Sequence, residues 1–238
     1  MILSTIVLGA LVAVGCGPKG RNLTTDQGTM AEGDRLRKSE FFEEARKQYF
    51  RIRTEFPQSQ LQVEADLKIA DSYFEEEAYA AAANAYEEFI KTYPGRPEVP
   101  EAVYKLGMSY VRQMPNTAQR DTRATHKVID TFTRLLIDYP NSPKAAEAQK
   151  HIEEARTQLA SKIFEIGRFY EKQGHFDSAA RRYAELLQQF PDHTLAEESM
   201  AREVACLRKL KQDEKAEETA SAFNRKYPNS KFGSLVKK

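Results

Sequence analysis

The side chains that could do chemistry in this sequence are few, and their spacing does not favour catalysis. No HExxH motif, no Cys/His spacing suited to a metal and no glycine-rich phosphate loop occurs. His151 and Glu154 are three positions apart, which on a helix predicts a surface contact rather than a pair of ligands. The four histidines are scattered through the second half of the chain: His126, His151, His175 and His193. We therefore expect no metal, no cofactor and no enzymatic activity.

The two cysteines stand in very different surroundings, so no disulfide framework is implied. Cys206 lies on an apolar helical stretch with Val204 and Leu207, and this setting predicts a buried, inert thiol. Cys16 follows a short apolar segment near the N-terminus. Only Cys16 is therefore a candidate for chemical modification.

The elements that must position these residues are amphipathic helices. In residues 160–191, apolar residues recur at helical spacing on both sides of Gly174, which predicts two helices with a turn between them. Gly167 and Ala179 are small enough to let the two backbones approach closely. Pro191 ends the second helix because proline lacks an N–H and disfavours helical geometry in the residue before it. One such hairpin cannot bury its apolar face alone.

The same unit recurs along the chain. A small or apolar residue stands 24 positions before a proline in four copies, and every such proline follows Phe or Tyr. The copies are Gly33 to Pro57, Ala70 to Pro94, Gly167 to Pro191 and Val204 to Pro228, and a fifth, Gly107 to Pro140, carries nine extra residues. This pattern resembles the tetratricopeptide repeat. The resemblance implies an all-α fold, a tetratricopeptide-repeat superhelix of about five helical hairpins with an insertion in the third.

The N-terminal segment reads as a targeting signal. Residues 1–15 contain an apolar run of thirteen residues, too short for the roughly 20 that a membrane-spanning helix needs. The following Ala13-Val14-Gly15-Cys16 resembles the bacterial lipobox, and this resemblance implies lipidation of Cys16 by acyl chains such as palmitate. Gly17, where an inner-membrane lipoprotein would carry Asp, implies the outer membrane. No basic residue precedes the apolar run, so the true start of the chain could lie upstream.

Four segments follow from this pattern. Residues 1–15 are expected to form a signal peptide, and residues 16–29 a lipid-anchored tether. We expect the tether to be flexible because it is rich in turn formers. Residues 30–140 form an N-terminal half with repeats one to three, and residues 141–238 a C-terminal half with repeats four and five and the tail. Residues 145–172 are expected to form one long helix. Lys and Arg number 36 against 35 Asp and Glu, a balance that argues against a nucleic-acid partner.

The signal, the five repeats and the interrupted third repeat together resemble the BamD family of outer-membrane assembly lipoproteins, also called ComL or YfiO. The order Tyr104-Lys105-Leu106-Gly107, then Arg120-Asp121, then Tyr139-Pro140-Asn141-Ser142 carries the resemblance most specifically. It implies a non-catalytic protein, lipid-anchored on the periplasmic face of the outer membrane. It also implies that the N-terminal repeats bind targeting segments of unfolded outer-membrane proteins. The C-terminal repeats would dock on the periplasmic domains of a BamA-like barrel subunit, beside other assembly lipoproteins.

Two surfaces are candidates for these contacts. The first helices of the repeats should line a groove able to hold an extended peptide. Its expected residues are Asp34, Arg37, Leu67, Asp71, Phe74, Tyr104, Met108, Val111 and Arg112, although each could equally be ordinary surface. The long segment between the helices of repeat three predicts a projecting loop with Arg120, Asp121 and Arg123, either a partner site or a tolerated insertion. The alternative function is a repeat scaffold of a Tol-Pal-like division system.

Overall fold

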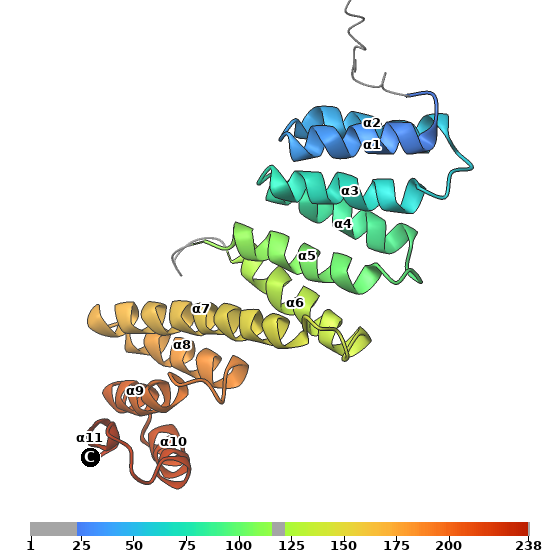
Figure 1. Ribbon diagram of the computed structural model, residues 1–238. Helices are drawn as coiled ribbons and strands as arrows, with labels where there is room; N and C mark the ends of the chain where they lie inside the picture. Colours follow the sequence, from blue (N-terminus) through green and yellow to red (C-terminus); the bar gives the residue numbers. More distant parts are fainter. Residues whose placement is uncertain (1–22, 116–121, 238) are drawn as a thin grey trace, which may run out of the picture. The chain divides into compact units, whose positions relative to one another are not determined.

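The computed structural model describes residues 23–115 and 122–237, and within these ranges it is entirely helical. Figure 1 shows the helices following one another along the chain as antiparallel pairs. The helices are α1 Asp26–Lys38, α2 Phe42–Glu55, α3 Gln62–Glu75, α4 Tyr79–Thr92, α5 Val99–Gln113, α6 Arg123–Asp138, α7 Ala145–Lys172, α8 Phe176–Gln189, α9 Ala196–Lys209, α10 Asp213–Lys226 and α11 Gly233–Val236. The prediction of an all-α tetratricopeptide-repeat fold is confirmed.

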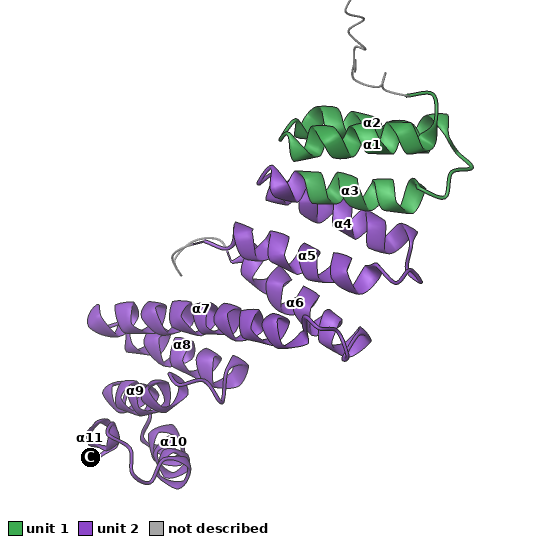
Figure 2. Ribbon diagram, viewed as in Figure 1, with its two compact units in different colours: residues 1–72 green, residues 73–238 purple. Residues whose placement is uncertain are grey.

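The described residues divide into two compact units, and Figure 2 colours them separately. The first unit ends at Ser72, inside α3, and the second runs from Tyr73 to the C-terminus. In the first unit α1 packs on α2, and the core contains Met30, Ala45, Tyr49, Ile52 and Ala65. In the second unit each helix from α4 to α9 contacts the next one along the chain, and α11 contacts α9. The division expected at Pro140 rests on the repeat count and stays a prediction.

Helix boundaries follow the sequence signals closely. The predicted helix over residues 145–172 is present as α7, and Gly174 next to it has a φ of +78°, which glycine adopts without a Cβ penalty. The same turn in three other repeats is made by a residue with a side chain, at Glu40, Glu77 and Lys211, with φ values near +60°. Glycine is therefore not required for this turn, although in repeat four it removes the cost of the positive φ. α1 begins at Asp26, before the expected start of repeat one, because Thr25 Oγ1 caps the Gly28 N–H at 3.1 Å.

The recurring glycine lies against an aromatic ring of the second helix in three hairpins. A Cβ added at Gly33, Gly107 or Gly167 would meet the ring of Tyr49, Phe132 or Tyr183 at 2.5, 2.4 and 2.8 Å. All three rings are fully buried. The glycine thus makes the space that the ring fills, and this is the physical reason for the repeated pairing of small and aromatic residues.

Repeat five reverses this pairing of sizes. Val204 stands at the glycine position of α9, and Ala220 stands sixteen residues later, where Tyr183 follows Gly167 by the same spacing. Val204 and Ala220 are both buried in one cluster, together with Phe223. A larger residue on the first helix is accommodated because its partner on the second helix is small.

Most turns that follow the Phe/Tyr-Pro steps share one hydrogen bond. After four of the five steps, a side chain accepts the backbone N–H two residues further on: Ser59 from Leu61, Ser142 from Lys144, His193 from Leu195 and Ser230 from Phe232. Three of these acceptors are serine hydroxyls, whereas His193 uses Nδ1 at 3.1 Å. An imidazole can accept there only while it is neutral.

Candidate functional site

In the first unit, the expected groove residues form an ion-pair cluster between α1 and α3. Lys68 Nζ lies 2.7 Å from both carboxylate oxygens of Asp34, and the Tyr49 hydroxyl donates to Asp34 Oδ1 at 2.8 Å. Lys68 also contacts Glu64 at 2.9 Å. Asp34 therefore holds the first helix to the third and is itself oriented by the tyrosine at the centre of the hairpin.

A second pair lies three residues further along the same two helices. Arg37 Nη1 is 3.7 Å from Asp71 Oδ2, and both side chains are partly exposed. Leu67 is half-buried on α3, beside Lys68 in sequence. The structure thus brings Asp34 to Lys68 and Arg37 to Asp71, and it supplies Lys68, which we did not single out from the sequence. The signal that could have found it is the spacing of 34 residues between Asp34 and Lys68, close to one repeat length.

In the second unit, Phe74 packs on the start of α4. Its ring lies 5.4 Å from that of Tyr79 in an edge-to-face contact. Gln113, at the end of α5, donates to the Tyr79 carbonyl at 3.2 Å. Phe74 is half-buried, so part of its ring is accessible.

Tyr104 is mostly a core residue. Its side chain is 7% exposed, its ring lies 5.8 Å from that of Phe132, and Lys144 Nζ sits 4.7 Å above it. Burial, and then a hydrogen bond to Glu147, raises the pKa of Tyr104 above its usual range. The rings of Phe74 and Tyr104 therefore contact different neighbours, and Tyr104 joins α5 to α6 and α7 rather than standing clear of the surface.

The other α5 residues are more accessible. Met108 and Val111 are half-buried and Arg112 is exposed. These residues follow Tyr104 at helical spacing on one side of α5, so exposure increases along that side from Tyr104 to Arg112. Tyr110 donates its hydroxyl to Glu87 Oε1 at 2.6 Å, and Lys127 Nζ lies 5.8 Å from its ring. Burial, and then the bond to Glu87, raises the pKa of Tyr110 above its usual range. Tyr110 thus links α4, α5 and α6, a role that its sequence position did not predict.

Arg120 and Asp121 of the expected loop lie outside the described residues, as do Cys16 and the signal peptide. Arg123 is exposed as the first residue of α6. Gln158 of α7 holds both ends of the insertion, because its amide donates to the Pro115 carbonyl and accepts from the buried Thr125 hydroxyl at 2.8 Å. The described residues on both sides of the expected loop are therefore held by one side chain of α7.

The expected contact of His151 with Glu154 is present, with Nδ1 and Oε2 2.9 Å apart. The His151 ring also stacks on Phe132 at 5.6 Å. Across residues 23–115 and 122–237 no group of three or more His, Cys, Asp or Glu side chains is arranged to hold a metal ion. Cys206 is buried as predicted, and burial raises the pKa of its thiol to about 12. Such a thiol stays protonated and is a poor nucleophile.

A polar network that the sequence did not reveal crosses the next hairpin. Glu171 at the end of α7 accepts from the Tyr183 hydroxyl at 2.6 Å and lies 3.0 Å from Arg202 Nη1 of α9. Arg202 also bonds Glu198 at 2.7 Å. Burial, and then the bond to Glu171, raises the pKa of Tyr183. This network fixes successive hairpins to one another.

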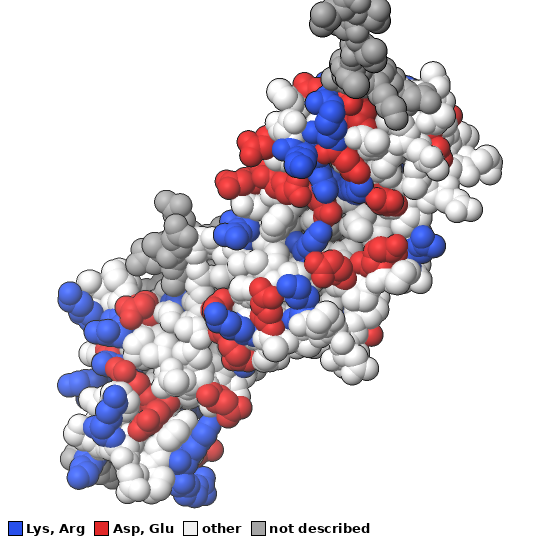
Figure 3. Space-filling view, viewed as in Figure 1, with Lys and Arg blue, Asp and Glu red and all other residues white. Residues whose placement is uncertain are grey.

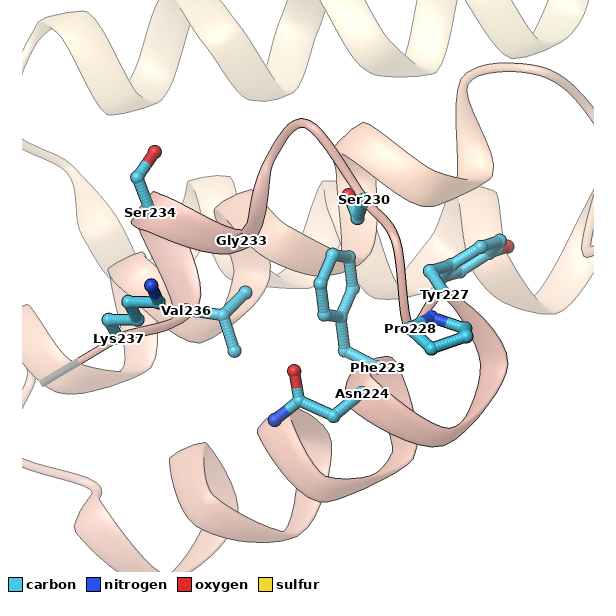
Figure 4. Close-up of a pocket in the computed structure, with 9 residues that line it drawn as sticks. All are labelled: Phe223, Asn224, Tyr227, Pro228, Ser230, Gly233, Ser234, Val236 and Lys237. Atoms are coloured by element: carbon cyan, nitrogen blue, oxygen red, sulfur yellow. The ribbon is translucent and has the colours of Figure 1, made fainter.

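A pocket of about 350 Å³ lies at the last hairpin, between α10 and the single turn of α11. In Figure 4 the Phe223 ring points from α10 toward the turn that carries Ser230, with Val236 on one side and Pro228 on the other. The lining residues are Phe223, Asn224, Tyr227, Pro228, Ser230, Gly233, Ser234, Val236 and Lys237. The lining thus combines the buried Phe223 ring with polar side chains that include the Asn224 amide and the Lys237 cation.

Acidic and basic side chains are interspersed across the face seen in Figure 3, in agreement with the near-zero net charge. No helix in the described part of the chain is both long enough and apolar enough to span a bilayer. Paired helices, glycine-aromatic contacts and shared inter-repeat turns define a tetratricopeptide-repeat protein. Its surfaces offer ion pairs, half-buried apolar side chains and a small pocket.

Within that class, the sequence places the chain in one family. A family model described as "YfiO: Outer membrane lipoprotein" matches residues 29–223, and the chain belongs to this family. The match covers four-fifths of the chain, from α1 into α10.

Individual relatives agree with this assignment. The outer membrane protein assembly factor BamD of Neisseria gonorrhoeae is 25% identical over 97% of this chain and 92% of its own length. The protein of the same name from Rickettsia prowazekii is 25% identical over 99% of this chain and 94% of its own. A putative BamD from Aquifex aeolicus is 30% identical over 56% of this chain and 43% of its own.

Solved structures resemble the chain only distantly. The TPR2AB domain of yeast Sti1 in complex with a pHSP90 gives a TM-score of 0.44 at 16% identity, covering 90% of this chain and 81% of the other. YrrB, a TPR protein, gives 0.36 at 16% identity, covering 90% and 92%. The family assignment therefore rests on the sequence.

Proposed function

We propose that this protein is a non-catalytic, lipid-anchored periplasmic scaffold of the machinery that assembles β-barrel proteins in the outer membrane. The observation that carries the proposal is the family match over residues 29–223, together with relatives named as outer membrane protein assembly factors along nearly their whole length. Its partners would be a BamA-like barrel subunit through its periplasmic domains, other assembly lipoproteins, and unfolded outer-membrane proteins. The outer membrane itself would hold the chain through acyl chains on Cys16.

The targeting peptide would bind to the faces that carry the expected groove residues. In the first unit, Lys68 and Arg37 could bind a peptide carboxylate by exchanging their contacts with Asp34 and Asp71. In this exchange each cation stays paired with a carboxylate, and Asp34 keeps the hydrogen bond from the Tyr49 hydroxyl. In the second unit, the accessible parts of Phe74 and Met108 would contact apolar side chains of the peptide. Extended peptides are commonly bound by such alternating apolar and polar contacts.

The C-terminal repeats would dock on the barrel subunit. The pocket beside Phe223 supports this part of the proposal, because it is concave, partly apolar and built into the last hairpin. An apolar side chain of the partner could enter beside Phe223, while Asn224 and Lys237 bond its backbone carbonyls.

The first experiment is co-purification after gentle detergent extraction of cell membranes. We expect a large β-barrel subunit to accompany the chain. Recovery of peptidoglycan-linked division proteins without a barrel subunit would refute the assignment. Mass spectrometry of the extracted protein tests the anchor, since an acylated N-terminal cysteine at position 16 is expected.

The second experiment measures binding of a synthetic C-terminal peptide of a barrel protein. Phe74→Ala should weaken binding, whereas Phe169→Ala, which removes an exposed ring outside the expected groove, should not. Tyr104 needs a milder substitution because its ring is part of the core, so Tyr104→Phe keeps the packing and removes only the hydroxyl. Unchanged affinity in Phe74→Ala would exclude this placement of the peptide.

A further inference from the structure

The outward side of α2 carries an exposed aromatic ring among long cationic side chains. Phe50 is 52% exposed and lies opposite the buried side formed by Ala45 and Ile52. At 100° per residue, five further residues fall within about 60° of Phe50 around the helix. We call Phe50 and these residues the α2 outer face, and they are Glu43, Arg46, Lys47, Arg53 and Thr54. Three cations and one acid give this face an excess of positive charge.

The chain enters the first unit beside this face. The Leu23 carbonyl accepts from Arg51 Nη2 and from the Thr29 hydroxyl, each at 3.4 Å. Arg51 adjoins Phe50 in the sequence, and a bidentate bond to Glu55 at 2.7 and 2.8 Å holds its guanidinium in place. The described N-terminus is therefore fixed next to the exposed ring.

The segment that leads to the proposed anchor is short. From Cys16 to Leu23 there are seven residue steps. At no more than about 3.6 Å each, they span at most about 25 Å. With Cys16 acylated, Leu23 is confined to within that distance of the lipid surface, and the α2 outer face lies next to Leu23. Such confinement corresponds to a millimolar or higher effective concentration, so that even a weak contact forms.

The chemistry of the face matches the headgroup layer of an anionic bilayer. The Arg53 guanidinium lies 6.0 Å from the Phe50 ring, and Lys47 is largely exposed. Lys and Arg can lay their stems along an apolar surface while their charges reach phosphate oxygens. Lys47 contacts Glu43 at 2.6 Å, and because both side chains are exposed this ion pair is weak enough to exchange for phosphate. Arg53 is more than half exposed and lies 3.9 Å from the largely buried Asp66, at the limit of an ion pair, so its guanidinium can also reach phosphate. Each cation near an anionic surface adds to the attraction between the face and the bilayer.

We propose that the α2 outer face rests on the membrane to which the chain is anchored, with Phe50 inserted at the boundary of headgroups and acyl chains and Lys47 and Arg53 bound to lipid phosphates. This inference rests on the proposed lipid anchor. It adds an orientation, because the first repeat is held with α2 toward the bilayer and its α1–α3 ion-pair cluster free to receive a peptide.

The test uses fluorescence, since the chain has no tryptophan of its own. The full-length Phe50→Trp protein, purified with its native N-terminus, is bound to vesicles of phosphatidylethanolamine and phosphatidylglycerol that carry bromine near the top of the acyl chains. Protein whose Cys16 is unmodified is attached through a maleimide lipid instead, and the buried Cys206 does not compete. Attachment is thereby secured whether or not the cell acylates the chain.

Two chains with equally exposed rings serve as controls. Phe41→Trp replaces a ring that is 56% exposed. Phe41 lies ten residues before Arg51, the residue that holds the N-terminal segment, so the two residues are about 15 Å apart along the helix direction. Phe169→Trp replaces a ring that is 60% exposed in the second unit. Because interfacial insertion reaches only about 5–10 Å below the headgroups, we expect the Phe50→Trp emission to be quenched at least about twofold more than either control. Adding Lys47→Glu and Arg53→Glu should abolish the difference.

Equal quenching of the three chains on vesicles would overturn the proposal. A second outcome would also overturn it: Phe50→Trp emission that brominated lipid does not quench, but that is shielded from an aqueous quencher in the detergent-extracted complex. The α2 outer face would then bind protein rather than lipid. Failure of the cell-purified chain to bind vesicles without the maleimide lipid refutes the natural anchor alone. The maleimide-attached sample still decides whether the face contacts lipid.

Discussion

Substituting Gly107 tests whether close packing of a glycine against an aromatic ring stabilises the hairpins. In Gly107→Ala, the new Cβ would lie 2.4 Å from Cε1 of Phe132 and 2.6 Å from Cζ. Ordinary contact requires about 3.5 Å, so the ring would have to shift by about 1 Å. Phe132 has no room to do so, because it is fully buried, tilted against Tyr104 and stacked on His151.

The expected change in stability is the balance of two terms. Overpacking a well-packed core costs about 1–3 kcal/mol. Alanine is better than glycine inside a helix by about 0.5–1 kcal/mol. The contact at Gly107 is the tightest of the three glycine-aromatic contacts, so the packing term should fall in the upper part of its range. We therefore expect Gly107→Ala to destabilise the second unit by about 2 kcal/mol.

Urea unfolding followed by circular dichroism measures the overall loss, and amide hydrogen exchange locates it. Repeat proteins can unfold region by region, so the local measurement is needed. A loss of about 2 kcal/mol should speed exchange in α5 and α6 by about thirtyfold. Gly95→Ala is the matched control, because a Cβ there meets nothing within 4 Å. It should change stability by no more than about 0.5 kcal/mol.

A double-mutant cycle with Phe132→Leu gives the outcome that would refute the reasoning. If the ring is the obstacle, Phe132→Leu should cost less in the Gly107→Ala background than in the parent, with a coupling of at least about 0.5 kcal/mol. Additive effects, or a Gly107→Ala protein as stable as Gly95→Ala, would show that the ring does not limit the space beside the glycine.

Three further predictions concern turns and buried charge. Burial holds the pKa of His193 below its ordinary value of 6.5, with Arg156 adding to the effect and Glu153 opposing it. The contribution of neutral His193 to the stability of the fold is therefore present above pH 6.5 and is lost as the pH falls toward the folded-state pKa. His193→Ser, which copies the acceptor at Ser230, should flatten that part of a pH series of urea midpoints. Burial raises the pKa of Glu203 from 4.5 to about 7. The contribution of protonated Glu203 to the stability of the fold is therefore present below pH 4.5 and is lost as the pH rises through 7. Glu203→Gln should raise stability most above pH 7, and an equal gain at pH 4 would contradict this. Lys211→Gly should stabilise the last hairpin by up to about 1 kcal/mol because the residue has a φ of +59°, and a loss of thermal stability would show that its side chain matters more than its backbone.

Several features of the candidate site could be predicted from the sequence. The helical period placed Met108 and Val111 on the same side of α5, and the repeat spacing identified α1 and α3 as successive first helices. The burial of Cys206 followed from its apolar neighbours. These features depend on local periodicity, which the order of residues contains directly.

Contacts between helices could not be predicted in the same way. Tyr104 was expected in an open groove, and the structure packs it against Phe132 with its hydroxyl bonded to Glu147. Asp34 was expected to face the groove, and the structure shows it bonded to Lys68 and Tyr49, which the sequence did not predict. Helical spacing identifies the face on which a side chain lies, but not which neighbouring helix covers that face.

The sequence by itself determined the repeat, the helix pairs, the long helix α7 and the family to which the chain belongs. Tertiary structure alone decided which polar side chains are already engaged, as in the bonds of Glu171 to Tyr183 and Arg202. The physical reason is the range of the forces involved. Backbone geometry and apolar periodicity act over a few residues, whereas the partners of Asp34 and Glu171 lie 34 and 31 residues away and meet them only after the hairpins have packed.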